Sequence, residues 1–262
     1  MLIETNGVET NYELTGNGAC LVLIHGFSDN LNMWYHQVPA LAENYRVLTY
    51  DVRGFGKTKT EAASYSMDIF ADDLYELLMA LNIKSVCVLG YSMGGRIGLK
   101  FTLKHPELTR GLIFANSVVG GSRTAEMEDR AKLMMDILEK GDNKAISEMM
   151  AVGSFSPDYK ERKPSEFKKY MEIKMQNDPS SYPAVMQAMF SEFEATPDLS
   201  QLKCPVLIIA GENDAFMEVS IAESMKRDIN DSELKILPTG HAAAIEAPDL
   251  FNGLVFEFVE RL

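Results

Sequence analysis

A serine lies between two glycines in the segment Gly90-Tyr91-Ser92-Met93-Gly94, directly after the apolar run Val86–Leu89. The apolar run predicts a buried strand, and the residues from Met93 to about Lys104 predict a helix. A sharp turn between a strand and a helix requires small residues on both sides, and it exposes the central side chain. The serine hydroxyl would then lie beside a helix N-terminus, whose free N–H groups favour negative charge. The motif is short, so its meaning depends on partner residues elsewhere in the chain.

Serine attacks an acyl carbon only with help from three kinds of group. A base must take its proton, an acid must orient the base, and N–H donors must stabilise the oxyanion. His241 follows the last predicted strand, and Asp214 follows the strand before it. The order Ser92, Asp214, His241 is the order expected of a serine on a strand-to-helix turn. Glu212 in the same turn as Asp214 is an alternative acid, and Asp214 as a simple turn residue is the other alternative.

The elements that would position these residues alternate along the chain. A hairpin is predicted around Asn6-Gly7. Further strands are predicted at 20–24, 46–50, 86–89, 112–115, 206–210 and 234–237, with helices at about 31–43, after Ser66, at 93–104, at 221–227 and near the end of the chain. This order predicts an α/β fold, with a mostly parallel eight-stranded sheet and helices on both faces. In such sheets ligands bind at the carboxyl ends of the strands, where His25, Asp51, Ser92 and Asn116 fall.

Residues 120–196 depart from this alternation and contain no strand-like run. We expect them to form a helical cap inserted into a core domain made of residues 1–119 and 197–262. The segment is rich in methionine, at Met127, Met134, Met135, Met149, Met150, Met171, Met175, Met186 and Met189. Methionine suits a mobile apolar surface, and it is equally an ordinary core residue of helices, so both interpretations stay open.

Composition excludes several classes of function. The 262 residues carry a formal net charge of −13, which argues against binding to nucleic acid or to an anionic membrane surface. No apolar run is long enough to span a membrane, and Met1–Thr5 does not resemble a signal peptide. Cys20, Cys87 and Cys204 lie in or beside strand-like runs without a paired spacing. This pattern is typical of buried free thiols and predicts a cytoplasmic protein.

Taken together, the motifs resemble those of the α/β-hydrolase family. They extend over nearly the whole chain as His25-Gly26-Phe27, Asp51-x-Arg53-Gly54-x-Gly56, Gly90-x-Ser92-x-Gly94-Gly95, Gly211-x-x-Asp214 and Gly240-His241. The resemblance implies that Ser92 is the nucleophile, His241 the general base and then acid, and Asp214 the residue that orients His241. It also implies an oxyanion hole formed by the backbone N–H groups of Phe27 and Met93. It implies neither a metal nor a cofactor.

Within the family the chain looks most like the branch of small esterases, perhydrolases and enol-lactonases. Ser92 argues against dehalogenases and epoxide hydrolases, which use aspartate, and Ala242 argues against C–C bond hydrolases, which usually have tryptophan there. We expect Phe27, Tyr91 and Met93 to line an apolar pocket for a small ester or lactone. The prediction is therefore a carboxylesterase acting on short to medium acyl chains through an acyl-enzyme. A lactonase or perhydrolase is the alternative, and a ligand receptor that retains the triad is the alternative from another class.

Overall fold

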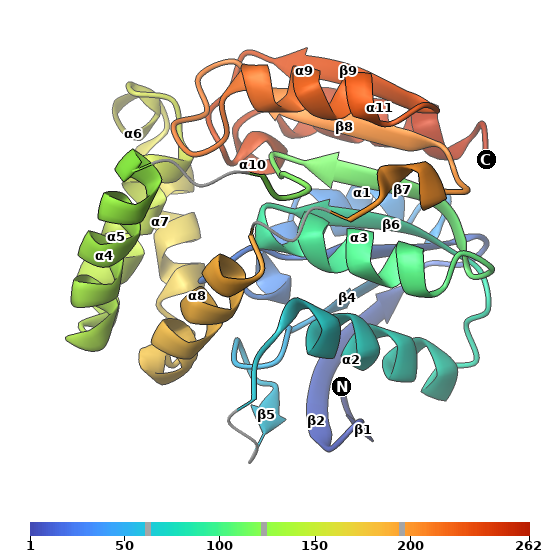
Figure 1. Cartoon of the computed structure of the whole chain (residues 1–262), viewed down its shortest axis with the longest axis horizontal. Helices are drawn as coiled ribbons and strands as arrows, with labels where there is room; N and C mark the ends of the chain where they lie inside the picture. The colour runs from blue at the N-terminus through green and yellow to red at the C-terminus, as the bar shows by residue number, and fades with distance from the viewer. Residues whose placement is uncertain (61–63, 122–124, 194–196) are drawn as a thin grey trace.

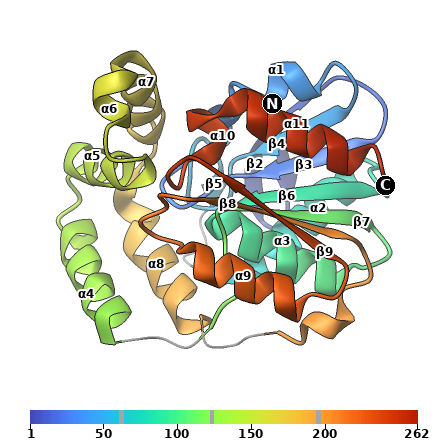
Figure 2. The same cartoon turned by 90° about the horizontal axis from the view of Figure 1, so that it is seen from above.

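A mostly parallel sheet crosses the molecule, and helices cover both of its faces (Figures 1 and 2). The computed structural model describes residues 1–60, 64–121, 125–193 and 197–262. In these ranges the strands are β1 (Leu2–Thr5), β2 (Val8–Thr15), β3 (Cys20–Ile24), β4 (Arg46–Tyr50), β5 (Lys59–Thr60), β6 (Val86–Tyr91), β7 (Thr109–Ala115), β8 (Val206–Gly211) and β9 (Ser232–Leu237). Eight of them follow the order β1-β2-β4-β3-β6-β7-β8-β9, and the mostly parallel sheet that the sequence predicted is confirmed. The short β5 is a ninth strand, paired with β2.

Two apolar clusters lie on opposite faces of this sheet. One joins Val22 and Val88 to α2 (Met67–Ala80), α3 (Met93–Lys104) and α9 (Val219–Asp228). The other joins Leu23 and Leu89 to α1 (Gln37–Leu41) and α11 (Pro248–Val259). Neighbouring residues of one strand belong to different clusters because successive side chains point to opposite faces. A strand that is buried on both faces reads as a continuous apolar run, which is why these strands were visible in the sequence.

Local signals place several of these elements where the sequence predicts them. Asn6 and Gly7 both have positive φ, 50° and 68°, as a two-residue hairpin turn between β1 and β2 requires. Helix α2 begins after Ser66, whose side chain accepts a hydrogen bond from the Ile69 amide at 3.0 Å. The N-cap of α2 and the hairpin between β1 and β2 were therefore both predictable from a few neighbouring residues.

The predicted helix at 31–43 is wrong as a continuous element. The chain forms a 3-10 turn at Leu31–Trp34 and then the short helix α1. Pro39 supplies the physical reason, because it would lie in the interior of a helix starting at residue 31. There it would remove a hydrogen bond and clash with the preceding turn. In the shorter α1, Pro39 lies near the start, where its missing N–H costs little.

A group of helices separates β7 from β8. It consists of α4 (Ala125–Glu139), α5 (Asn143–Ser154), α6 (Tyr159–Arg162), α7 (Pro164–Lys174) and α8 (Tyr182–Ser191). Figure 1 shows these helices together beyond the ends of the parallel strands, and the described residues between β7 and β8 contain no strand. The predicted boundary at residue 196 and the side chain of Met127 lie outside the described residues. No helix in the described ranges is long and apolar enough to cross a membrane.

The methionines of this segment behave mainly as core residues. Met186 is buried, and most of the others are partly buried, several of them packed against the cluster that contains α2 and α3. Met175 is the exception among those described, with 41% of its surface exposed. The interpretation as ordinary helix core therefore accounts for most of these positions.

Candidate active site

Ser92 occupies a strained turn between β6 and α3. Its backbone has φ 52° and ψ −116°, a conformation that residues other than glycine rarely adopt. The Ser92 amide donates to Ala115 O at 3.0 Å, and the Gly95 amide donates to Ser92 O at 3.0 Å. A Cβ on Gly90 would lie 2.2 Å from the carbonyl oxygen of Gly94, so only glycine fits at this position. The spacing of small residues around the serine thus follows from close approach of the backbone.

The structure brings Ser92, His241 and Asp214 together. Ser92 Oγ lies 2.9 Å from His241 Nε2, and His241 Nδ1 lies 2.8 Å from Asp214 Oδ2. The side chains of His241 and Asp214 are 5% and 1% exposed. With the carboxylate accepting from Nδ1–H, the Nε2 atom is left to accept the serine proton. Glu212, the alternative acid, is exposed and makes neither contact.

Asp214 is held by more donors than the sequence indicated. Its Oδ1 accepts the amides of Phe216 and Met217, each at 2.9 Å, and its Oδ2 accepts Asn116 Nδ2 at 3.0 Å. Burial raises the pKa of this carboxyl, but the charge of His241 and these hydrogen bonds outweigh burial and bring the pKa below its usual value. The carboxylate is therefore ionised. Asn116 was placed at a strand end by the sequence, but its role depends on a contact 98 residues away.

Two aromatic rings fix the orientation of His241. The ring of Tyr91 lies 5.1 Å from the imidazole, and the ring of Phe216 contacts it edge-on at 5.0 Å. Tyr91 also packs edge-on against Trp34, in the cluster that contains α1 and α11. Phe27 and Met93 belong to the other cluster. Tyr91 therefore lies in a different apolar cluster from Phe27 and Met93, and its part in lining a substrate pocket stays a prediction.

Glu246 joins the histidine loop to the helical segment, which the sequence did not reveal. Its Oε2 accepts the Gly240 amide at 2.8 Å and the Ser156 amide at 3.1 Å, and its Oε1 accepts the Ser156 hydroxyl. The side chain is only 4% exposed. Gly240 immediately precedes His241, so this carboxylate fixes the main chain next to the imidazole. The Ala242 amide adds a bond to Ser154 O at 2.6 Å on the other side of His241.

The turn Gly26–Asp29 contains the second predicted oxyanion donor. The Asp29 amide donates to Gly26 O at 3.2 Å, which closes the turn. His25 links this turn to the chain that follows β4 through two hydrogen bonds. Its Nε2 accepts the Val52 amide at 2.9 Å, so Nδ1 carries the proton and donates to Gly26 O at 2.8 Å. Burial lowers the pKa of His25, which keeps it neutral and structural.

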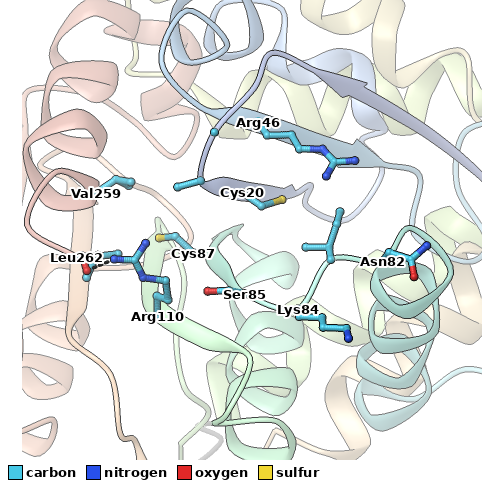
Figure 3. Close-up of a pocket in the computed structure, with 12 residues that line it drawn as sticks. Cys20, Arg46, Asn82, Lys84, Ser85, Cys87, Arg110, Val259 and Leu262 are labelled. Carbon is cyan, nitrogen blue, oxygen red and sulfur yellow. Dashed lines mark hydrogen bonds between the residues drawn. The ribbon is translucent and has the colours of Figure 1, made fainter.

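A separate pocket of about 380 Å³ lies at the opposite end of the sheet (Figure 3). It is bordered by Cys20, Ser85, Cys87 and Arg110 near the amino ends of β3, β6 and β7. Arg110 reaches the main-chain oxygen of Leu262 across it. Ser92 follows the carboxyl end of β6, so the length of that strand separates this pocket from Ser92. The pocket is therefore no part of the candidate active site.

Comparison with known proteins defines the class. The alpha/beta hydrolase fold family matches residues 20–248, and the chain belongs to this family. It is a hydrolase related to esterases and enol-lactonases. The 3-oxoadipate enol-lactonase 2 of Acinetobacter baylyi is 28% identical over 256 residues, which cover 97% of this chain and 94% of the relative.

Two solved structures share the architecture of this chain at low sequence identity. A thermophilic esterase from Thermogutta terrifontis superposes with a TM-score of 0.90 at 26% identity, covering 100% of this chain and 98% of that one. A bromoperoxidase from Bacillus anthracis superposes with a TM-score of 0.88 at 26% identity, covering 97% and 96%. These relatives differ in the reaction named for them, so the substrate of this chain has to be argued from its own site.

Proposed function

We propose that this hydrolase cleaves carboxylic esters of short to medium acyl chain through an acyl-enzyme on Ser92. The observation that carries the proposal is the continuous chain of hydrogen bonds from Ser92 Oγ through His241 to Asp214, at 2.9 and 2.8 Å. Both distances are within the reach that proton transfer requires. A serine with such a base can act as a nucleophile at neutral pH.

The proposed reaction has two halves. His241 Nε2 takes the proton of Ser92 as Oγ attacks the ester carbonyl, and the amides of Phe27 and Met93 donate to the oxyanion that forms. When the tetrahedral intermediate collapses, His241 returns the proton to the leaving alcohol and the acyl group stays on Ser92. His241 then deprotonates a water, which attacks the acyl-enzyme and releases the acid. Asp214 stabilises the imidazolium in both halves without accepting a proton itself.

The surroundings favour an apolar acyl group. Phe27 and Met93 share one apolar cluster with Val119, Tyr182 and Met186, which come from the β7–α4 connection and from α8. The ring of Phe27 lies 5.0 Å from that of Tyr182. We assign the helical segment 120–196 as a cap that closes over this cluster, and a small apolar ester as the ligand. A lactonase is the second candidate, supported by the enol-lactonase relative.

Initial rates on p-nitrophenyl esters from acetate to decanoate test the proposal. We expect wild type to show an optimum at a short or medium chain and Ser92→Ala to fall to the uncatalysed rate. Ser85→Ala, at the other end of β6, is the matched control and should keep the wild-type rate. Equal rates for wild type and Ser92→Ala would refute the acyl-enzyme. Faster turnover of lactones than of open-chain esters would select the second candidate, and ligand-induced thermal stabilisation without turnover would indicate a receptor.

A further inference from the structure

Helix α7 contacts the turn Gly26–Asp29 through side chains that are almost fully buried. Lys174 Nζ lies 2.7 Å from Asp29 Oδ1, and both side chains are 1% exposed. The same ammonium donates to Ser28 Oγ at 3.1 Å. Tyr170, one turn earlier on α7, donates its hydroxyl to Asp29 Oδ2 at 3.2 Å. The polar side chains of the turn are therefore held by α7.

The main chain of the turn is held from the same region. Asn177 Nδ2 donates to Ser28 O at 2.9 Å, and Asn30 Nδ2 donates to Ile173 O at 2.9 Å. All of these bonds are buried and join residues more than 140 positions apart in the sequence. The turn thus receives its geometry from the helical segment as well as from the strand that precedes it.

Ser28 shows why this support matters. Its φ is 61°, in the left-handed region that favours glycine. A non-glycine residue stays in such a conformation only where its surroundings hold it there. Lys174 binds the side chain of Ser28, and Asn177 binds its carbonyl oxygen. Ser28 directly follows Phe27, so the bonds that hold Ser28 restrain the main chain one peptide away from the Phe27 amide.

Stability alone does not account for the buried pair. Two charges taken out of water lose hydration that their attraction only partly restores, and replacement by apolar residues is often neutral or stabilising. Burial lowers the pKa of Lys174, against the opposing effect of the Asp29 charge, so the environment disfavours the ammonium. A buried pair that adds little stability and contacts a strained turn fits a role in fixing geometry.

We propose that Lys174 is a positioning residue that fixes the oxyanion turn through Asp29 and Ser28, so that the alignment of the Phe27 amide depends on the placement of α7. The proposal rests on the proposed function, which assigns this amide to the oxyanion. In this proposal Lys174 affects catalysis only through the turn Gly26–Asp29.

The experiment compares three variants of the full chain. Lys174→Met leaves the Asp29 charge buried and unpaired, which could destabilise the fold. The double variant Asp29→Asn/Lys174→Met removes both charges and therefore leaves no uncompensated charge. Lys168→Met is the matched control, the same change on the same helix at a side chain that is 73% exposed. Each variant is measured for kcat and KM on the best p-nitrophenyl ester. Amide hydrogen exchange of the peptide covering residues 25–33 is followed by mass spectrometry as a readout that needs no activity.

We expect faster exchange of this peptide in both Lys174 variants and wild-type exchange in Lys168→Met. We also expect kcat to fall about 10- to 100-fold with KM within about twofold, somewhat less than the loss of an oxyanion donor outright. Unchanged exchange would overturn the proposal, and so would faster exchange with full kcat. A third outcome separates the two proposals. If exchange is faster in the Lys174 variants while wild type and Ser92→Ala are equally inactive, the role of Lys174 in holding the turn is supported and the proposed esterase is refuted.

Discussion

Replacement of Asp214 by asparagine tests the proposed triad most directly, because the hydrogen bonds leave the asparagine amide only one arrangement. Oδ1 of Asp214 accepts the main-chain amides of Phe216 and Met217. An asparagine must turn its oxygen toward these two donors, since its NH2 would meet them as a third donor. The NH2 group then takes the place of Oδ2, facing His241 Nδ1.

This arrangement moves the imidazole proton of His241 from Nδ1 to Nε2. An NH2 donor at 2.8 Å from Nδ1 requires Nδ1 to accept, so the proton moves to Nε2 and the ring can no longer accept from Ser92. In a serine protease the corresponding change of tautomer lowers kcat about 10⁴-fold. That factor corresponds to about 5 kcal/mol in activation free energy. The new NH2 also faces Asn116 Nδ2, which removes a hydrogen bond of about 1 kcal/mol from the folded state.

The assay compares kcat/KM of wild type, Asp214→Asn and Glu212→Gln on the best ester, with thermal unfolding of each. We expect a loss of about 10⁴-fold for Asp214→Asn and a small decrease in Tm. Glu212→Gln makes the same chemical change two residues away at an exposed position, and it should keep wild-type activity. Activity of Asp214→Asn within tenfold of wild type, or a loss confined to Glu212→Gln, would refute the assignment of Asp214 as the orienting acid.

Three further predictions follow from packing and burial. Gly90→Ala would place a Cβ 2.2 Å from Gly94 O and should lower stability by about 3 kcal/mol, together with activity. Gly253→Ala meets nothing within 4 Å in the interior of α11 and should raise stability by about 0.5–1 kcal/mol, so equal melting temperatures of the two variants would contradict the packing argument. Burial raises the pKa of Cys20 and of Cys204 to about 11, so at pH 8 the folded protein should react slowly with Ellman's reagent, and denatured protein fast. These thiols keep their protons in the folded state while the unfolded chain loses them, so unfolding free energy should fall from about pH 8.5 toward pH 11.

The parts of the site that the sequence predicted depend on short-range signals. Ser92 lies in a turn where Gly90 is required by contacts with Gly94 and Gly95, although Gly94 itself is required by the distant backbone of Ile24 and His25. Asp214 follows a strand that is visible as an apolar run, and His241 follows the next strand. Strand alternation places Tyr91 on the face opposite Val88, in agreement with the apolar cluster to which each belongs. The prediction of a continuous helix at 31–43 was wrong because it followed the apolar spacing and gave too little weight to Pro39, which breaks a helix there.

The parts that could not be predicted depend on contacts between distant segments. Asn116 supports Asp214 across 98 residues, and Lys174 reaches Asp29 across 145. From the sequence alone, a polar side chain in a helix or at a strand end could equally be exposed to solvent. Only the packed structure shows that it is buried against a partner. The strand β5 was missed for a related reason, because two residues carry no periodicity and pair only when β2 is present.

The distance between Asp29 and Lys174 along the chain also bears on synthesis. At about 5–20 residues per second the turn at Gly26–Asp29 leaves the ribosome roughly 7–30 s before Lys174 does. His241 follows later still, so a growing chain contains the Ser92 turn long before it contains His241 or the residues that hold the turn Gly26–Asp29. We therefore expect an incomplete chain to be hydrolytically silent, with activity acquired only as the last strands and helices join the sheet.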